Sequence, residues 1–194
     1  ENWCMMIPGL KVVAPSSPRD VIGLLAASVR DTDPVIFLEH KSLYPTKGEV
    51  PDGEIVDSLG TAKVLRSGKD ATICALALMV PRALEAAEKL KTEHGIDCEV
   101  VDVRSLVPLD TQTILGSVAK THRLFTVEEN PRLCGWGAEI VSITADGDLV
   151  VLAFVRELPD PKEPGRKYTT TWFDMFRIAD GKIAEHWDPA EKQP

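Results

Sequence analysis

The order of apolar and polar residues changes character near residue 146. Before that point, short apolar runs alternate with stretches whose apolar residues lie three or four positions apart. The runs are typical of buried strands and the stretches of amphipathic helices. Beyond it, two runs with a period of two flank Asp180-Gly181, a dipeptide typical of a hairpin turn. The pattern therefore predicts two structural parts.

The first repeating unit is predicted as strand, helix, strand. Residues 10–14 form an apolar run, and Ser17 and Pro18 then provide a helix cap and a favourable first helical position. A second apolar run covers residues 35–38. Residues 41–60 hold prolines, glycines and charges without periodicity, which predicts a linker.

The same alternation continues up to residue 146. Strands are expected at residues 72–78, 98–106 and 124–128, and helices from Pro81 to Gly95, after the capping Asp110, and at 137–144. Strands that alternate with helices favour an α/β fold with a mostly parallel, doubly wound sheet. The runs at 149–155, 169–178 and 183–187 predict an appended antiparallel hairpin or meander.

Charge and composition narrow the partners. The chain has 194 residues and a formal net charge of −8, which disfavours nucleic acid and anionic lipid. Its four cysteines are scattered without a metal-binding spacing, as expected for a reducing compartment. No apolar run approaches the roughly 20 residues of a membrane span. We expect a bacterial cytoplasmic or organelle matrix protein, and the start at Glu1 without a methionine suggests a piece of a longer one.

Several phrases resemble one enzyme family in order and spacing: IPGLKVVAPSSPRDVIGLLAASVRDTDPVIFLEHKSLYP, KGEVP, VDVRSLVPLDTQTI and VEENPRLCGWGAEI. The family is the β subunit of the thiamine-diphosphate-dependent decarboxylating component of 2-oxo acid dehydrogenases of the pyruvate, branched-chain or acetoin type. The resemblance implies that residues 1–45 end a pyrimidine-binding domain. It also implies that residues 46–146 form a transketolase C-terminal-like domain.

Residues 147–194 resemble a different family, the C-terminal half of SnoaL-like polyketide cyclases. The phrases are GDLVVLAFVRELPDPKEPG and FDMFRIADGKIAEHWD. That resemblance implies a partial cone-shaped α+β fold and makes Asp174 and His186 candidate acid and base residues. With half of the fold present, cyclase activity is not expected, since a hairpin alone is marginally stable.

The first resemblance implies a role in oxidative decarboxylation of a 2-oxo acid with acyl transfer to lipoyl. The cofactor, thiamine diphosphate with magnesium, performs that chemistry in the full heteromer. The implied partners are an α subunit, a second β subunit and the dihydrolipoyl acyltransferase core. The glutamate and histidine that act on cofactor and substrate belong upstream of Glu1, so this chain alone is expected to be inactive, to bind no cofactor and to serve in subunit assembly. The preferred oxo acid stays open.

One site of the resembled family falls within the chain. It is a potassium site at Ser28, Val29, Asp31 and Asp33, where a helix end offers carbonyl oxygens to a hard cation. Asp33 departs from the asparagine often found there. The alternative is an ordinary helix end with two exposed acids.

Other candidate groups have simpler explanations. Glu39 and His40 follow a strand, but a lone histidine there is more often a packing or interface residue than a catalytic one. Glu128 and Glu129 precede a GWG loop, where two acids argue against an anion site and favour a subunit contact. Histidines 40, 94 and 122 lack ligand spacing, so no zinc site is expected.

Two further functions remain open from the residues. The chain could be a non-catalytic dimerisation module that presents the hairpin, or a small-molecule binder with a pocket near Trp172 and Trp187. A separate expectation concerns stability: without the closing strand and helix of the resembled family the sheet has an open edge, which the hairpin could cover, and removal of residues 147–194 would then cause aggregation.

Overall fold

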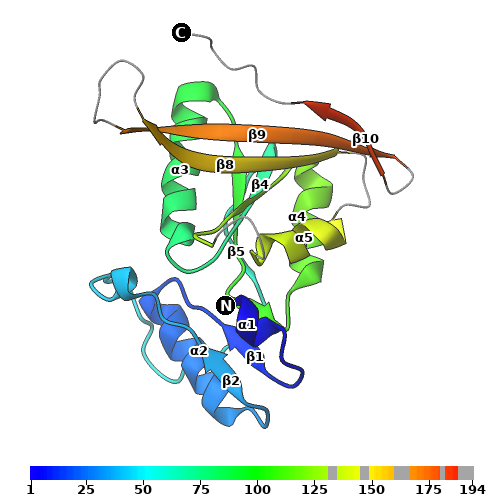
Figure 1. The fold of residues 1–194 in the computed structure, drawn as a ribbon. Helices are drawn as coiled ribbons and strands as arrows, with labels where there is room; N and C mark the ends of the chain where they lie inside the picture. Colours follow the sequence, from blue (N-terminus) through cyan, green and yellow to red (C-terminus); the bar gives the residue numbers. More distant parts are fainter. Residues whose placement is uncertain (131–134, 145–148, 160–166, 180–181, 188–194) are drawn as a thin grey trace. The chain divides into compact units, whose positions relative to one another are not determined.

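The computed structural model describes residues 1–130, 135–144, 149–159, 167–179 and 182–187. The backbone divides into two compact units, residues 1–143 and 144–194, and each is described by itself. Figure 1 shows the elements of both units.

The first sheet lies in the N-terminal part of the first unit. Its central strand β1 (Lys11–Val13) pairs in parallel with β2 (Val35–Phe37) and antiparallel with β6 (Ser105–Val107). Helix α2 (Pro18–Arg30) connects β1 to β2, and the Ser17 side chain caps it by accepting from the Asp20 amide, as expected. The short α1 (Asn2–Met5) precedes β1, and a 3-10 turn, η1 (Lys41–Leu43), follows β2.

The second sheet has four strands in the order β3-β5-β4-β7. β5 (Cys98–Asp102), β4 (Ala71–Ala75) and β7 (Leu124–Val127) run parallel, and β3 (Lys63–Arg66) pairs antiparallel with β5. Helix α3 (Met79–His94) covers one face, and α4 (Thr111–Thr121) and α5 (Gly137–Thr144) lie on the other (Figure 1). The predicted doubly wound α/β fold is therefore confirmed.

Two apolar clusters hold this sheet between its helices. One lies under α3 and includes Ile73, Met79 and Val100. The other includes Val12, Val101 and Ile114, so strands from both sheets contribute to it. This shared core ties the N-terminal segment to the second sheet, because burying its apolar side chains removes them from water.

One expectation about strands was wrong, and one strand was not expected. Residues 98–106 form two strands and not one, since the chain leaves β5 after Asp102 and joins the other sheet as β6. Strand β3 was not predicted at all, because its four residues are too short and too polar for a clear period.

The second unit is an antiparallel sheet in the order β10-β9-β8, as the pattern predicted. β8 (Leu149–Pro159) pairs with β9 (Lys167–Ala179) from Leu149 opposite Arg177 to Pro159 opposite Lys167. β9 pairs in turn with β10 (Lys182–Trp187).

Candidate functional site

Arg104 lies where the chain passes from β5 into β6, and therefore between the two sheets. Its φ of 59° is in the left-handed region, which costs a residue with a side chain about 1–2 kcal/mol. Its carbonyl accepts from the Ala14 amide at 2.8 Å, which ties the turn to the end of β1. The side chain is 2% exposed. A buried guanidinium requires charged partners to offset the loss of hydration.

Asp57, from the segment between η1 and β3, is the main partner of Arg104. Its carboxylate accepts from Arg104 Nη2 and, at 2.6 Å, from Arg19 Nη1 of α2. Its backbone amide donates to the Gly23 carbonyl at 3.0 Å. Burial raises the pKa of Asp57, but the Arg19 hydrogen bond and the charges of Arg104 and Lys63 outweigh it, and the pKa lies below its usual range. Asp57 is thus held ionised between two guanidinium groups.

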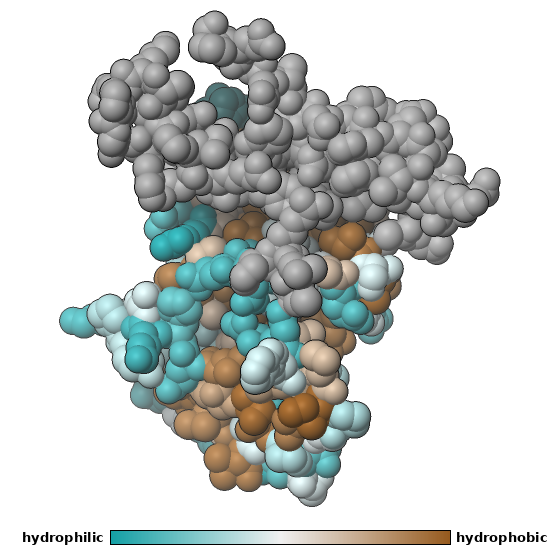
Figure 2. All heavy atoms as spheres, viewed as in Figure 1, coloured by the Kyte–Doolittle hydropathy of each residue, from teal (hydrophilic) through white to brown (hydrophobic). Residues whose placement is uncertain are grey.

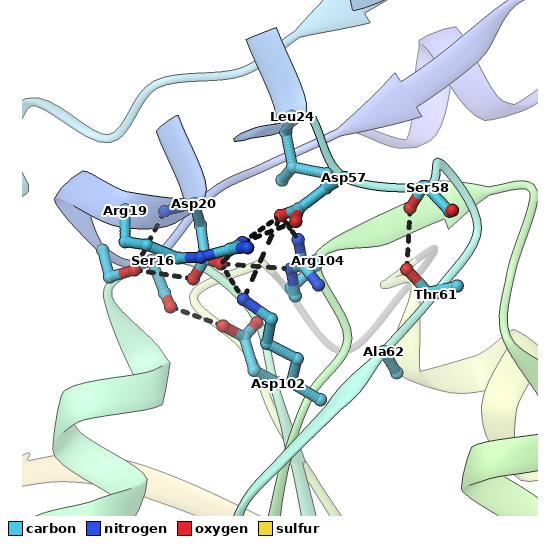
Figure 3. A network of polar contacts seen from close by, with 12 residues as sticks. Ser16, Arg19, Asp20, Leu24, Asp57, Ser58, Thr61, Ala62, Asp102 and Arg104 are labelled. Carbon is cyan, nitrogen blue, oxygen red and sulfur yellow. Dashed lines mark hydrogen bonds and ion pairs between the residues drawn. The ribbon is translucent and has the colours of Figure 1, made fainter. Parts of the chain in front are cut away.

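Asp20 extends this network into helix α2. It accepts from Lys63 Nζ and from Ser17 Oγ at 2.7 Å, and its Oδ1 lies 3.5 Å from Arg104 Nε. Lys63 belongs to β3, so one carboxylate joins a helix beside the first sheet to a strand of the second. Figure 3 shows Arg19 and Asp20 of α2 and Arg104 of the β5–β6 turn converging near Asp57.

Asp102 is the third acid of the cluster and has a different environment. It is fully buried, and its Oδ2 accepts a hydrogen bond from Ser16 Oγ (Figure 3). Its Oδ1 has no hydrogen-bond partner in the described part of the chain. Burial raises the pKa of Asp102 to about 7, helped by the Asp20 charge and opposed by Ser16 and Arg104. We call the six groups Ser16, Arg19, Asp20, Asp57, Asp102 and Arg104, together with Lys63, the junction network.

A pocket of about 390 Å³ lies beside the start of α2 and the end of β2. Ser16 lines it, together with Glu39, His40 and Tyr44. His40 Nδ1 accepts from the Ser42 amide at 3.2 Å, and its Nε2 lies 2.9 Å from Glu129 Oε2. Because both ring nitrogens already have partners within this chain, the geometry favours a packing role of His40 over catalysis.

Glu128 fills the space that an anion would need at the GWG loop. Its Oε1 accepts from the Gly137 amide at 3.2 Å. A side chain at Gly135 or Gly137 would meet this carboxylate at 2.3 Å or 2.7 Å. Burial raises the pKa of Glu128. A carboxylate thus caps the start of α5, which disfavours an anion at the same amide, and the subunit contact expected of this loop stays a prediction.

The predicted potassium residues lie at the end of α2, where Lys11 joins them. Lys11 Nζ is 2.7 Å from both oxygens of Asp31 and 3.2 Å from Asp33 Oδ2. Ser28 accepts from the Asp31 amide at its carbonyl, and its hydroxyl donates to Leu24. Two carboxylates against one ammonium leave a net charge of −1, which is compatible with one monovalent cation. Sequence reasoning missed Lys11 because it lies 20 residues away.

The hairpin candidates lie in the second unit. Asp174 is in β9 opposite Leu152, and His186 is in β10 opposite Phe176. Their side chains lie outside what the structure describes, so their pairing stays a prediction. Among the described residues, no group of three or more metal-binding side chains is found, and no helix is long and apolar enough to cross a membrane.

Sequence reasoning missed the junction network, although one signal was present. Asp102 and Arg104 fall inside the apolar run at 98–106. Charged residues are rarely buried unless they are paired, so two of them in such a run indicate partners elsewhere. Those partners, Asp20 and Asp57, carry no pattern of their own that could have identified them.

Two family models match the chain in succession. The transketolase pyrimidine-binding domain matches residues 1–47, and the transketolase C-terminal domain matches residues 60–175, more than half of the chain. The chain belongs to the transketolase C-terminal domain family. The junction network and the strand exchange at β6 thus join residues matched by the two models.

Similar proteins agree with this family assignment. The β subunit of acetoin:2,6-dichlorophenolindophenol oxidoreductase of Cupriavidus necator is 44% identical over 178 residues, which are 92% of this chain and 52% of that subunit. The β subunit of the mitochondrial pyruvate dehydrogenase E1 component of Pisum sativum is 50% identical over 143 residues, 72% of this chain and 40% of its own. The chain spans about half the length of the curated relatives it matches.

A solved structure shows the same fold. It is described as a split gene transketolase, an inactive β4 tetramer, with a TM-score of 0.65 and 30% identity. The matched region covers 75% of this chain and 47% of the chain in that solved structure. The predicted resemblance to β subunits is confirmed by these similarities. The SnoaL-like resemblance of residues 147–194 receives no support from them, and the transketolase match continues to residue 175.

Proposed function

We propose that this chain is part of the β subunit of a thiamine-diphosphate-dependent 2-oxo acid dehydrogenase of the pyruvate or acetoin type. The observation that carries this is that a pyrimidine-binding segment is followed by a C-terminal transketolase segment. Over 178 residues the chain is also 44% identical to the β subunit of an acetoin:2,6-dichlorophenolindophenol oxidoreductase. The junction network supports it, since it holds the two segments in one compact unit. Thiamine diphosphate and magnesium would supply the decarboxylation chemistry when bound by the complete heteromer.

Within that enzyme we assign this chain a role in subunit assembly. Ile22, Leu25 and Val29 are 43%, 46% and 78% exposed along one face of α2. Their spacing of three and four residues is that of a helix-packing stripe. Figure 2 shows apolar side chains gathered over the N-terminal segment. The partners proposed are an α subunit, a second β subunit and the acyltransferase core, in a bacterial cytoplasm or an organelle matrix.

A chimaera tests the assignment. The matching segment of the Cupriavidus necator β subunit is replaced by this chain, and the product is co-expressed with that enzyme's own α subunit. We expect a co-purifying heteromer that oxidises acetoin or pyruvate only when thiamine diphosphate and magnesium are added. A chimaera that folds but neither binds the α subunit nor turns over either substrate would contradict the proposal.

The potassium site at Ser28, Val29, Asp31 and Asp33 is part of the proposal. The surplus negative charge beside Lys11 supports it. In a titration of the chain at constant ionic strength, potassium should raise the unfolding midpoint more than lithium. An Asp33→Asn variant keeps an oxygen ligand but removes the surplus charge, so it should narrow that difference. Equal midpoints in both salts would refute this site.

A further inference from the structure

The two sheets of the first unit meet at the junction network, and Asp102 holds a special position there. It is the last residue of β5, directly before the turn that carries the chain to the other sheet. Its only hydrogen bond from a side chain among the described residues comes from Ser16, on the loop between β1 and α2. Ser16 and Asp102 are 86 residues apart, so this bond is a direct link between the two segments.

The charged groups around Asp102 come from every neighbouring element. Lys63 lies opposite it on β3, Asp20 comes from α2, and Arg104 follows on its own chain, whereas its β4 neighbour is the apolar Ala75. Lys63 contacts Asp20, and Arg104 contacts Asp57. The nearest cations are therefore already engaged with other carboxylates.

The charge balance alone would favour an ionised Asp102. Without it, Arg19, Lys63 and Arg104 face two carboxylates, which leaves one positive charge. Arg19 is 33% exposed, however, and water screens its charge, whereas Asp102 is fully buried. A buried carboxylate with a single side-chain donor in the described part of the chain loses more hydration than this screened charge returns.

We propose that Asp102 is a proton-dependent latch between the two sheets. When it is protonated, Ser16 and Asp102 share a hydrogen bond between neutral groups, because a hydroxyl can either donate or accept. When it is ionised, a second buried negative charge lies near Asp20, and its free Oδ1 has no donor in the described part of the chain. Opening of the contact between the β1–α2 loop and β5 then exposes the carboxylate to water and stabilises it.

The size of the effect follows from proton linkage. Burial raises the pKa of the closed carboxyl to about 7, whereas the open one titrates with an ordinary pKa of 3.8. The closed state binds more protons between these values, so closure weakens as the pH rises. From pH 6 to pH 8 the population of the open state should increase by about tenfold.

Amide hydrogen exchange of the whole chain measures this opening. The Ala14 amide donates to Arg104 across the contact. After correction for the intrinsic pH dependence of exchange, we expect its rate to rise about tenfold between pH 6 and pH 8. Amides in the β4–β5 ladder serve as the internal reference, and their corrected exchange rates should not rise with pH. In the Asp102→Asn variant, the rise of the Ala14 exchange rate with pH should disappear. The Asp52→Asn variant, changed at an exposed position, should retain that rise.

If the Asp102→Asn variant fails to fold, the pKa of the Asp102 carboxyl can be measured in the unsubstituted chain. The carboxyl carbon of Asp102, followed by carbon-13 NMR and assigned through bonds, should titrate near pH 7. Titration near pH 4, or an equal increase of exchange in β4 and β5, would overturn the latch. The measurement needs no cofactor or partner, so its outcome is independent of the proposed enzyme function.

Discussion

Arg104 shows how one side chain joins two segments of this protein. The backbone at this position is left-handed, a conformation that glycine adopts more readily, yet the position carries a large cation. The guanidinium fork contacts Asp57 and approaches Asp20 at the same time, which a single ammonium cannot do with the same geometry. The cost of the backbone conformation is therefore offset by the two carboxylates.

Arg104→Lys tests this interpretation at the scale of the residue. The variant keeps the charge but loses the fork, so it cannot contact Asp57 and approach Asp20 at the same time, and one of these buried carboxylates loses a cationic partner. We expect the free energy of unfolding to fall by about 2–4 kcal/mol, measured by urea denaturation. The exposed Arg82→Lys in α3 is the matched control and should change stability by less than about 0.5 kcal/mol. Equal effects of both substitutions would mean that the fork has no role.

The sequence alone could locate Arg104 in an apolar run but could not name its partners. Asp57 lies 47 residues away, in a stretch that the lack of periodicity marked only as a linker. A salt bridge depends on the distance between side chains, and that distance is set by the pairing of β6 with β1. No local pattern encodes it.

Helix α2 illustrates what local signals do determine at the scale of an element. The cap at Ser17 and Pro18 in the first turn were both visible in the sequence and are confirmed. Its glycine is different. Gly23 lies in the middle of the helix, where glycine normally costs roughly 0.5–1 kcal/mol relative to alanine. A side-chain carbon there would lie 2.7 Å from the carboxyl carbon of Asp57, so the glycine makes room for the network.

Two glycine substitutions separate this packing role from helix propensity. Gly116 lies in α4 and has no neighbouring atom within 4 Å of an added carbon, so Gly116→Ala should stabilise the chain by about 0.5–1 kcal/mol. Gly23→Ala should destabilise it by about 1–3 kcal/mol, because Asp57 must move away from two arginines. Thermal unfolding of both variants under identical conditions measures the difference. A stabilised Gly23→Ala would show that Asp57 can shift without cost.

At the scale of the whole molecule, the stability of the fold should depend on pH in two opposite ways, because some buried acids have a lowered pKa and Asp102 has a raised one. Burial opposes ionisation of Asp57 and Asp110, but hydrogen bonds and nearby cations lower the pKa of Asp57, and hydrogen bonds from Thr113 and Ala62 lower that of Asp110. A lowered pKa stabilises the fold above the pKa of the unfolded chain, and this stability is lost as the pH falls through the folded pKa.

Asp102 acts in the opposite direction. Its raised pKa means that the folded chain binds more protons than the unfolded chain between pH 4 and pH 7, so stability falls as the pH rises through that range. The decrease should be on the order of 4 kcal/mol relative to Asp102→Asn, by denaturation at each pH. The Asp102→Asn variant should still lose stability at acidic pH, but its free energy of unfolding should not decrease as the pH rises toward neutral. Parallel profiles would show that Asp102 titrates normally.

The second unit gives a further test at this scale. Among the described residues of the first unit, β7 pairs with β4 alone, so its other edge has no strand partner there. We expect deletion of residues 147–194 to cause aggregation, because an uncovered edge strand can pair with other molecules. Light scattering and size-exclusion chromatography of the deletion variant measure this. A soluble variant with a cooperative unfolding transition would refute the expectation.

The sequence by itself determined the alternation of strands and helices, the caps at Ser17 and Asp110, the helix end at Gly95 and the antiparallel character of β8, β9 and β10. These features depend on periodicity and on backbone preferences within a few residues. Only the tertiary structure decided that residues 98–107 serve two sheets and that Ser16, Asp20 and Asp57 meet Asp102 and Arg104. Burial and electrostatic contact depend on distances in space, and these are fixed only when the strands have paired.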